Sequence, residues 1–286
     1  YVADVCPTQS EIVLCLPKSW VIVVRTELPA AAEENLPEVI AHELDRITPF
    51  DPEDAFYDYR VVEKDKDKLH LAINAAGKKA LAPYLSALAD KGLTVVRIET
   101  NLAAVSAYLH HVGEEKDLIY VNIASGSYEG GFVQNGVLVA GFAGTFVEEE
   151  TRGFLPTEIR DNVTAWSEEL ERQKKVPRLF LRSDDPGLCP RWEKQLPVPL
   201  HWLRNHGTPL PEAMKEAKKE TAGEDISLEA AGGALSSLDL KSQAMNLLTR
   251  SRRERPSLPL TVTLILLLIL VSMAACCFFL PLYAEH

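Results

Sequence analysis

The sequence predicts an α/β domain with mixed sheets flanked by helices, followed by a tether and a single transmembrane helix. From Glu11 to Leu203, short runs rich in Val and Ile alternate with segments whose apolar residues recur at helical spacing. Beyond Leu210 the composition changes to Ala, Glu, Lys, Gly and Ser with few large apolar residues. Near the C-terminus, the 21 residues Leu260–Leu280 carry no charged side chain, a length that matches the ~30 Å hydrocarbon core of a bilayer.

The first half of the domain is predicted to consist of strands interleaved with helices. Pro49 ends the first helix because proline cannot continue it, and Gly92 suits the position just after the second. The charged stretch Lys64–Lys68 forms the turn of a strand pair. The predicted strands are Glu11–Cys15, Trp20–Thr26, Phe56–Glu63, Leu69–Ala75 and Thr94–Glu99, and the predicted helices are Glu33–Arg46, Lys78–Lys91 and Asn101–His111.

A second cycle of strands begins at Leu118. Asn135-Gly136 between two apolar runs is a strong indication of a hairpin, because both residues tolerate the backbone of a tight turn. The helix Pro156–Lys175 carries Ile159, Val163, Trp166 and Leu170 on one face. The predicted strands are Leu118–Ile123, Gly131–Gln134, Val137–Ala140, Leu179–Leu181 and a last one within Leu196–Leu203.

These patterns divide the chain into five parts. Residues 1–117 form a first α/β subdomain, 118–210 a second, 211–258 a flexible tether with a basic end, 259–281 the membrane helix and 282–286 the start of a periplasmic region. Because the chain starts with Tyr1 and stops shortly after the apolar run, we expect a fragment of a longer protein, truncated at its N-terminus.

Basic residues set the orientation of the predicted span. Arginines precede it and no basic side chain except His286 follows it, and Lys and Arg near a span stay on the cytoplasmic side. The domain is therefore expected in the cytoplasm and the C-terminus in the periplasm. The membrane-flanking arginines are Arg250, Arg252, Arg253 and Arg255.

Composition and motifs exclude several classes of function. A formal net charge of −11 argues against a nucleic-acid partner. The five cysteines show no metal-ligand spacing, and no metal site is expected. The loops and motifs of common nucleotide-binding enzymes, hydrolases and metalloproteases are absent, so we expect neither an enzyme nor a cofactor.

The loop Asn122–Gly131 leaves two interpretations open. It follows a buried strand and is rich in small residues, which can bring backbone N–H groups against a phosphate. The alternative is a tight β-turn that needs glycine only for its backbone. The residues of the phosphate-loop interpretation are Asn122, Ala124, Gly126 and Ser127.

Several motifs resemble one protein family. The stretch Ile40–Phe50, with its Asp-Arg-Ile-Thr-Pro-Phe core, is followed by Phe56–Arg60 and later by Leu88–Leu93. Together they resemble the cytoplasmic region of the type II secretion inner-membrane platform protein L (GspL) and the type IV pilus assembly proteins PilM and PilN. The resemblance covers Glu11 to Arg204. Further along, Met245-Asn-Leu-Leu248 before the span is similar to the start of the pilus N protein.

The resemblance implies an actin-like (ASKHA-type) fold for both subdomains. In that superfamily the second phosphate loop reads Asp-x-Gly-x-x-x-Thr, whereas this chain has Asn122 and Ala124 at the Asp and Gly positions. Loss of the carboxylate and the added methyl group both disfavour phosphate and magnesium. The resemblance therefore implies a non-catalytic scaffold. The alternatives are a type IV pilus or competence scaffold, and a membrane-tethered actin-like nucleotide switch.

The resemblance also implies the partners of the chain. They are a secretion ATPase of the E type, the M- and F-type platform subunits, a second copy of the chain and the lipid bilayer of the bacterial inner membrane. Within the chain, residues Met245, Asn246, Leu247 and Leu248 are a candidate peptide-docking element that occupies its own domain. The alternative is a plain helix next to the membrane.

Overall fold

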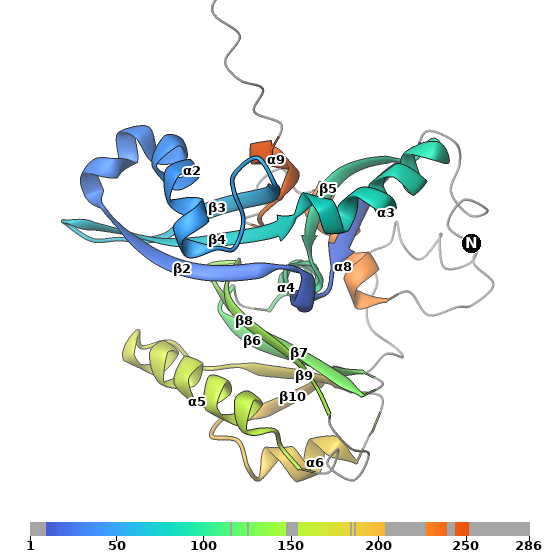
Figure 1. Ribbon diagram of the computed structural model, residues 1–286. Helices are drawn as coiled ribbons and strands as arrows, with labels where there is room; N and C mark the ends of the chain where they lie inside the picture. Colours follow the sequence, from blue (N-terminus) through green and yellow to red (C-terminus); the bar gives the residue numbers. More distant parts are fainter. Residues whose placement is uncertain are drawn as a thin grey trace, which may run out of the picture. The chain divides into compact units, whose positions relative to one another are not determined.

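The computed structural model describes residues 10–114, 116–124, 126–146, 154–183, 185, 187–203, 227–238 and 244–251. The described strands form sheets of two, three and five strands with helices packed on their faces (Figure 1). The predicted boundary between residues 117 and 118 falls between the strands of the two smaller sheets and those of the largest. The predicted α/β class with mixed sheets flanked by helices is confirmed.

The N-terminal half contains the two smaller sheets. One sheet is a parallel pair, and in the other a central strand lies between two antiparallel neighbours, in the order β2-β4-β3. The parallel pair is β1 (Glu11–Leu16) with β5 (Thr94–Thr100), and the second sheet is made of β2 (Ile22–Pro29), β3 (Ala55–Lys64) and β4 (Lys68–Gly77). The remaining elements are η1 (Lys18–Trp20), η2 (Ala30–Asn35), α2 (Leu36–Ile47), α3 (Lys78–Asp90) and α4 (Asn101–His111).

The second half builds the five-stranded sheet, in the order β10-β9-β6-β7-β8. An antiparallel run of three strands is joined to two strands parallel to the first, which makes the sheet mixed. The strands are β6 (Leu118–Ala124), β7 (Ser127–Gln134), β8 (Val137–Thr145), β9 (Leu179–Ser183) and β10 (Leu200–Leu203). The helices α5 (Thr157–Arg172) and α6 (Leu188–Glu193) complete this half.

Helices cover the sheets because each presents an apolar face at helical spacing. In α2, the buried Leu36, Ile40 and Leu44 pack on the three-stranded sheet. In α5, Ile159, Val163 and Trp166 pack on one face of the five-stranded sheet, and α4 packs on the other. Along β6 the side chains alternate between these two cores, with Ile119 in the α5 cluster and Tyr120 in the α4 cluster.

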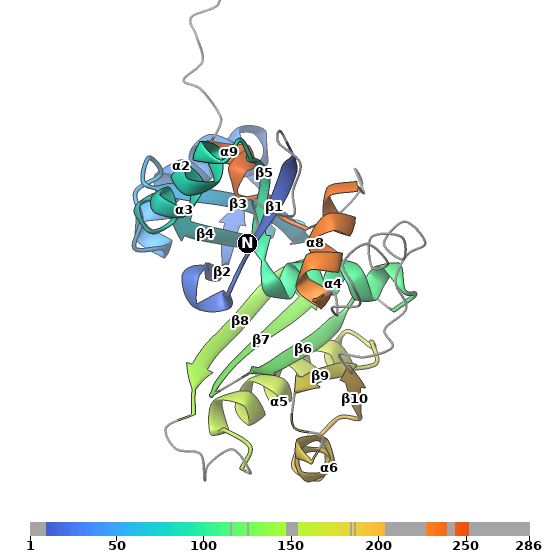
Figure 2. The ribbon, with the colours of Figure 1, turned by 90° about the vertical axis from the view of Figure 1, so that its right-hand side faces the viewer.

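The predicted tether differs from the structure. Two of its segments pack on the domain: α8 (Leu228–Leu238) lies against α4 beside β1 (Figure 2), and α9 (Leu248–Ser251) follows a buried stretch that begins at Ala244. The prediction of a flexible tether is therefore wrong for residues 227–238 and 244–251. The compact unit reaches Arg250 instead of ending near Leu210. The other residues of the predicted tether lie outside the described ranges.

Among the helices of the described ranges, none is both long and apolar enough to cross a membrane. The predicted span Leu260–Leu280, the predicted periplasmic residues 282–286, and the basic residues Arg252, Arg253 and Arg255 all lie outside those ranges. Arg250 lies in α9.

Candidate functional site

The candidate docking element is bound to the domain by an array of hydrogen bonds. We define the docking segment as residues Ala244–Leu248. The Leu247 amide donates to the carbonyl of Ile98 at 2.9 Å, and the Asn246 amide donates to Asp58 Oδ2 at 3.1 Å. The docking segment is therefore joined to β5 by one main-chain hydrogen bond and to β3 through the Asp58 carboxylate, at the edge of a strand.

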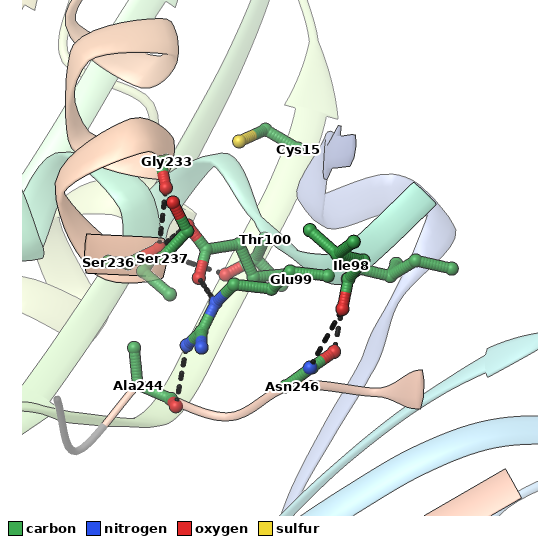
Figure 3. A network of polar contacts seen from close by, with 12 residues as sticks. Cys15, Ile98, Glu99, Thr100, Gly233, Ser236, Ser237, Ala244 and Asn246 are labelled. Atoms are coloured by element: carbon green, nitrogen blue, oxygen red, sulfur yellow. Dashed lines mark hydrogen bonds and ion pairs between the residues drawn. The ribbon is translucent and has the colours of Figure 1, made fainter. Parts of the chain in front are cut away.

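Asn246 is the centre of this contact (Figure 3). Its side-chain oxygen accepts hydrogen bonds from the amides of Ile98 and Leu248, both at 3.1 Å, and its Nδ2 donates to the Val96 carbonyl at 3.3 Å. A side-chain amide is suited to this position because it carries both an acceptor and a donor. The bonds fix the register of the docking segment against β5.

Apolar side chains of the docking segment enter two separate cores. Met245 belongs to the α5-side core of the five-stranded sheet. Leu247 and Leu248 belong to the cluster formed by β1, β5 and α3, which contains Leu16, Leu81 and Ile98. Burying a side chain of this size contributes about 1.5–3 kcal/mol. The docking segment thus contributes to the domain core, and helix α9 begins at its last residue, Leu248.

A buried ion pair lies beneath the docking segment. Arg97 Nε donates to Glu99 Oε2 at 2.6 Å, and Arg97 Nη2 donates to the Ala244 carbonyl at 2.7 Å. The Glu99 side chain is completely buried and that of Arg97 is 13% exposed. Burial raises the pKa of the Glu99 carboxyl above its usual range, and the bonds from Arg97 and Ser236 oppose that shift only in part. The pair is stabilised by its own hydrogen bonds rather than by water.

The raised pKa predicts how the stability of the domain changes with pH. A carboxyl whose pKa is raised on folding contributes stability below its unfolded pKa of about 4.5, and that contribution is lost as the pH rises through the folded pKa. We therefore expect the wild-type chain to lose thermal stability relative to Glu99→Gln as the pH is raised from about 4.5 to neutral. The measurement compares the thermal unfolding midpoints of the wild type and Glu99→Gln across this pH range, with the surface variant Glu38→Gln as control. A constant difference across this range would contradict the assignment.

The phosphate-loop candidates do not belong to the docking site. They lie at the turn between β6 and β7. Asn122, Ala124 and Ser127 line a cleft of about 470 Å³ together with Pro17 and Ser19. The stretch is a hairpin in which Ala124 is paired with Ser127, and Gly126 has the positive φ of 89° that such a turn requires. β7 therefore starts at Ser127, four residues before the predicted Gly131, and the tight-turn interpretation describes the backbone.

The carboxylate of Glu129 lies in this cleft and bonds groups from other elements. The Lys18 backbone amide donates to Glu129 Oε2 at 2.8 Å, and Asn101 Nδ2 donates to Glu129 Oε1 at 3.4 Å. Backbone amides of a turn that faces such a loop are the groups that would bind a phosphate. Here one of them is already bound to an anionic side chain, whose charge repels a second anion.

The chain is similar to known proteins in its fold and not in its sequence. No protein-family model matches it, and neither does any curated protein. A solved structure titled the PilM-PilN type IV pilus biogenesis complex aligns with 80% of this chain and 80% of its own, with a TM-score of 0.55 and 19% identity. The chain shares its fold with the aligned chain of that structure, which we call the PilM–PilN fold.

Further structures align less closely. The cytoplasmic domain of EpsL, an inner membrane component of the type II secretion system of Vibrio cholerae, aligns over 77% of each chain with 16% identity and a TM-score of 0.41. A protein from Bacteroides thetaiotaomicron with an actin-like ATPase fold and unknown function covers 68% of this chain and 67% of its own, with 11% identity and a TM-score of 0.33. The PilM–PilN likeness confirms, at the level of the fold, the resemblance inferred from the sequence motifs.

Four residues that bind the docking segment, or support the ion pair beneath it, were not among the candidates from the sequence. They are Asp58, Arg97, Glu99 and Ser236, and each is wholly or largely buried. A charged residue within an otherwise apolar strand is the available indication, as in Tyr57-Asp58-Tyr59 and Arg97-Ile98-Glu99. Ser236 lies in a stretch of small residues whose pattern gives no such indication.

Proposed function

We propose that the chain is a non-catalytic scaffold of a type II secretion system at the bacterial inner membrane. Its cytoplasmic domain docks the E-type secretion ATPase, and its span connects that domain to the M- and F-type platform subunits. The single observation that carries the proposal is the docking segment, which is bound to a domain of the PilM–PilN fold and lies directly ahead of the predicted span.

The order of parts along the chain supports this assignment. The related structure is a complex of two proteins, PilM and PilN. Here a domain of that fold and a Met-Asn-Leu-Leu element belong to one polypeptide, and the element is bound to the domain through Asn246. We infer that the contact is an intramolecular version of an M–N contact. Its physical effect is to hold the domain close to the membrane, where the concentration of membrane partners is raised.

The cleft at the β6–β7 turn supports a role without nucleotide hydrolysis. Asn122 lacks the carboxylate that would position magnesium or water, and Ala124 adds a methyl group to the loop. Glu129 accepts a hydrogen bond from the Lys18 backbone amide, so this amide is not available to bind a phosphate in the observed state. We include in this proposal that both subdomains have an actin-like fold.

Calorimetry on the full chain in detergent micelles tests the scaffold role. We expect saturable heat when the N-terminal domain of the cognate secretion ATPase is added, and none when magnesium ATP is added at millimolar concentration. The double variant Asn122→Asp, Ala124→Gly serves as the matched control for ATP, because it restores the loop residues that the resemblance implies. Absence of any ATPase binding would contradict the docking role.

The nucleotide-switch alternative gives the opposite pattern. It requires saturable ATP binding by the wild-type chain and tighter binding by the double variant. Co-purification from cells separates type II secretion from the type IV pilus alternative, since the ATPase and platform subunits recovered with the chain belong to one system or the other.

A further inference from the structure

Helix α8 is packed against α4 at unusually close range. A Cβ atom built on Gly232 would lie 1.8 Å from the carbonyl oxygen of Ala104, and one on Gly233 would lie 2.8 Å from Cys15 Sγ. Only glycine permits this approach, because any side chain at residue 232 meets the backbone of α4. α8 also covers the Cys15 thiol, whose pKa is raised to about 12, chiefly by burial. The position of α8 is therefore sensitive to a single substitution.

The ion pair beneath the docking segment also contacts α8. Ser236 Oγ donates to Glu99 Oε1 at 2.8 Å, while Arg97 bonds both Glu99 and the Ala244 carbonyl (Figure 3). One continuous chain of hydrogen bonds thus joins α8 to the docking segment through two buried charges. The nearby acidic Glu229 is paired with Arg182.

The two ends of this hydrogen-bond chain depend on one another. With α8 in place, Glu99 and Arg97 are shielded from water, and the bond from Arg97 to the Ala244 carbonyl acts in a medium of low dielectric constant. If α8 is displaced, water reaches Glu99 and competes for both charged groups. The hydrogen bond from Arg97 to the Ala244 carbonyl is then little stronger than a bond from Arg97 to water, and it contributes less to docking.

The length of the chain adds a second coupling. With α8 bound, the docking segment follows it after residues 239–243. With α8 displaced, the nearest element before the docking segment is β10, which ends at Leu203. Treated as an ideal loop, this longer connection lowers the effective concentration of the docking segment at its site roughly 20-fold.

We propose that α8 and the Arg97–Glu99 pair act as a latch that decides which docking segment fills the site on β5. While the latch is closed, the site holds the segment of its own chain. When the latch opens, the site accepts the docking segment of a second copy, because that segment offers the same Asn246 bonds and the same apolar side chains. The inference uses the docking geometry alone and does not depend on the assignment to a secretion system.

The test compares two adjacent serines of α8. Ser236 Oγ lies 2.8 Å from both Glu99 Oε1 and the Gly233 carbonyl, which share its single proton, whereas Ser237 Oγ donates to the Ala234 carbonyl at 2.8 Å and has no bond to Glu99. Ser236→Ala therefore removes the link to the ion pair, and Ser237→Ala is its matched control. Gly232→Val is the strong variant, since the added side chain displaces α8 from α4.

Three readouts on the full chain in micelles follow the latch. Alkylation of Cys15 reports displacement of α8, hydrogen exchange at the Leu247 and Ile98 amides reports release of the docking segment, and a fluorescent peptide of residues 242–251 reports a vacant site. For Gly232→Val we expect rapid Cys15 alkylation, exchange faster by roughly 20-fold and saturable peptide binding. For Ser236→Ala we expect exchange about fivefold faster. Ser237→Ala should behave as the wild type, which does not bind the peptide.

Each other outcome overturns a stated part of the proposal. If Cys15 becomes reactive in Gly232→Val while Leu247 and Ile98 stay protected, α8 and the docking segment are independent and there is no latch. If the docking segment is released but the peptide does not bind, the exchange with a second copy is wrong. If Gly232→Val does not fold, equal exchange in Ser236→Ala and Ser237→Ala refutes the latch. A failure here leaves ATPase docking untouched, since calorimetry measures that separately.

Discussion

Asn246→Ala is expected to detach the docking segment from β5 while the five-stranded sheet stays folded. The substitution removes the acceptor of the Ile98 and Leu248 amides and the donor to the Val96 carbonyl. Leaving a buried partner unsatisfied costs about 1–3 kcal/mol, and three groups lose their bond here, so we expect the docking equilibrium to lose at least roughly 3 kcal/mol. Hydrogen exchange at the Ile98 amide, resolved to single residues, measures this change directly.

Thr249→Ala is the matched control for this prediction. Thr249 is exposed and follows the docking segment immediately, and its backbone amide, which donates to the Asn246 carbonyl, is retained in the variant. We expect its exchange profile to equal that of the wild type. Unchanged protection of Ile98 in Asn246→Ala would show that the apolar side chains alone hold the docking segment, and that the register bonds contribute nothing.

Trp166→Ala is expected to have the largest effect on global stability. The Trp166 ring stacks on Phe132 and on Phe142, with a centroid distance of 5.6 Å to each, in the core that α5 forms on the five-stranded sheet. Truncating a buried tryptophan leaves a cavity and costs about 3–5 kcal/mol. Urea unfolding followed by circular dichroism at the far-ultraviolet helix band measures the loss.

A second aromatic truncation provides the comparison. Phe154 is 74% exposed, so Phe154→Ala should change the free energy of unfolding by less than about 0.5 kcal/mol. A loss below about 1 kcal/mol for Trp166→Ala would mean that the core relaxes around the missing ring and that the stack is dispensable.

The regular elements could be predicted from the sequence where periodicity is local. The α4 prediction, Asn101–His111, agrees with the structure at both ends, and the strand pair around Lys64–Lys68 appears as β3 and β4. In β4, Leu69, Leu71 and Ile73 alternate with small or polar residues, and Gly113 follows shortly after the end of α4.

The failures have tertiary causes. Gly130 was expected in a loop, but it is a strand residue because Phe142 packs directly over it, where a Cβ atom would lie 2.2 Å from the ring. α8 contains Gly232 and Gly233, which are unfavourable in an isolated helix, and only its contact with α4 explains it. α6 is a short helix with an internal proline, for which periodicity gives no indication.

The site could be predicted in part. Met245–Leu248 was identified because of its resemblance to a pilus protein, whereas the groups that receive it, Asp58, Ile98 and Arg97, come from strands far away in the chain. No single sequence reveals which distant strand edge a peptide will join. A fragment ended at Leu210, the predicted domain boundary, would lack α8 and the docking segment, and would expose the apolar surface that Leu247 and Leu248 cover.

The contact between β5 and the docking segment also determines when the domain can finish folding during its synthesis. Ile98 and Asn246 are separated by 148 residues. At a translation rate of ~5–20 residues per second, the docking segment is made roughly 7–30 s after β5. Throughout that interval the nascent chain presents an incomplete core, because Leu247 and Leu248 are not yet available to cover it. A pause in synthesis between β5 and the docking segment therefore prolongs the life of an aggregation-prone intermediate on the ribosome.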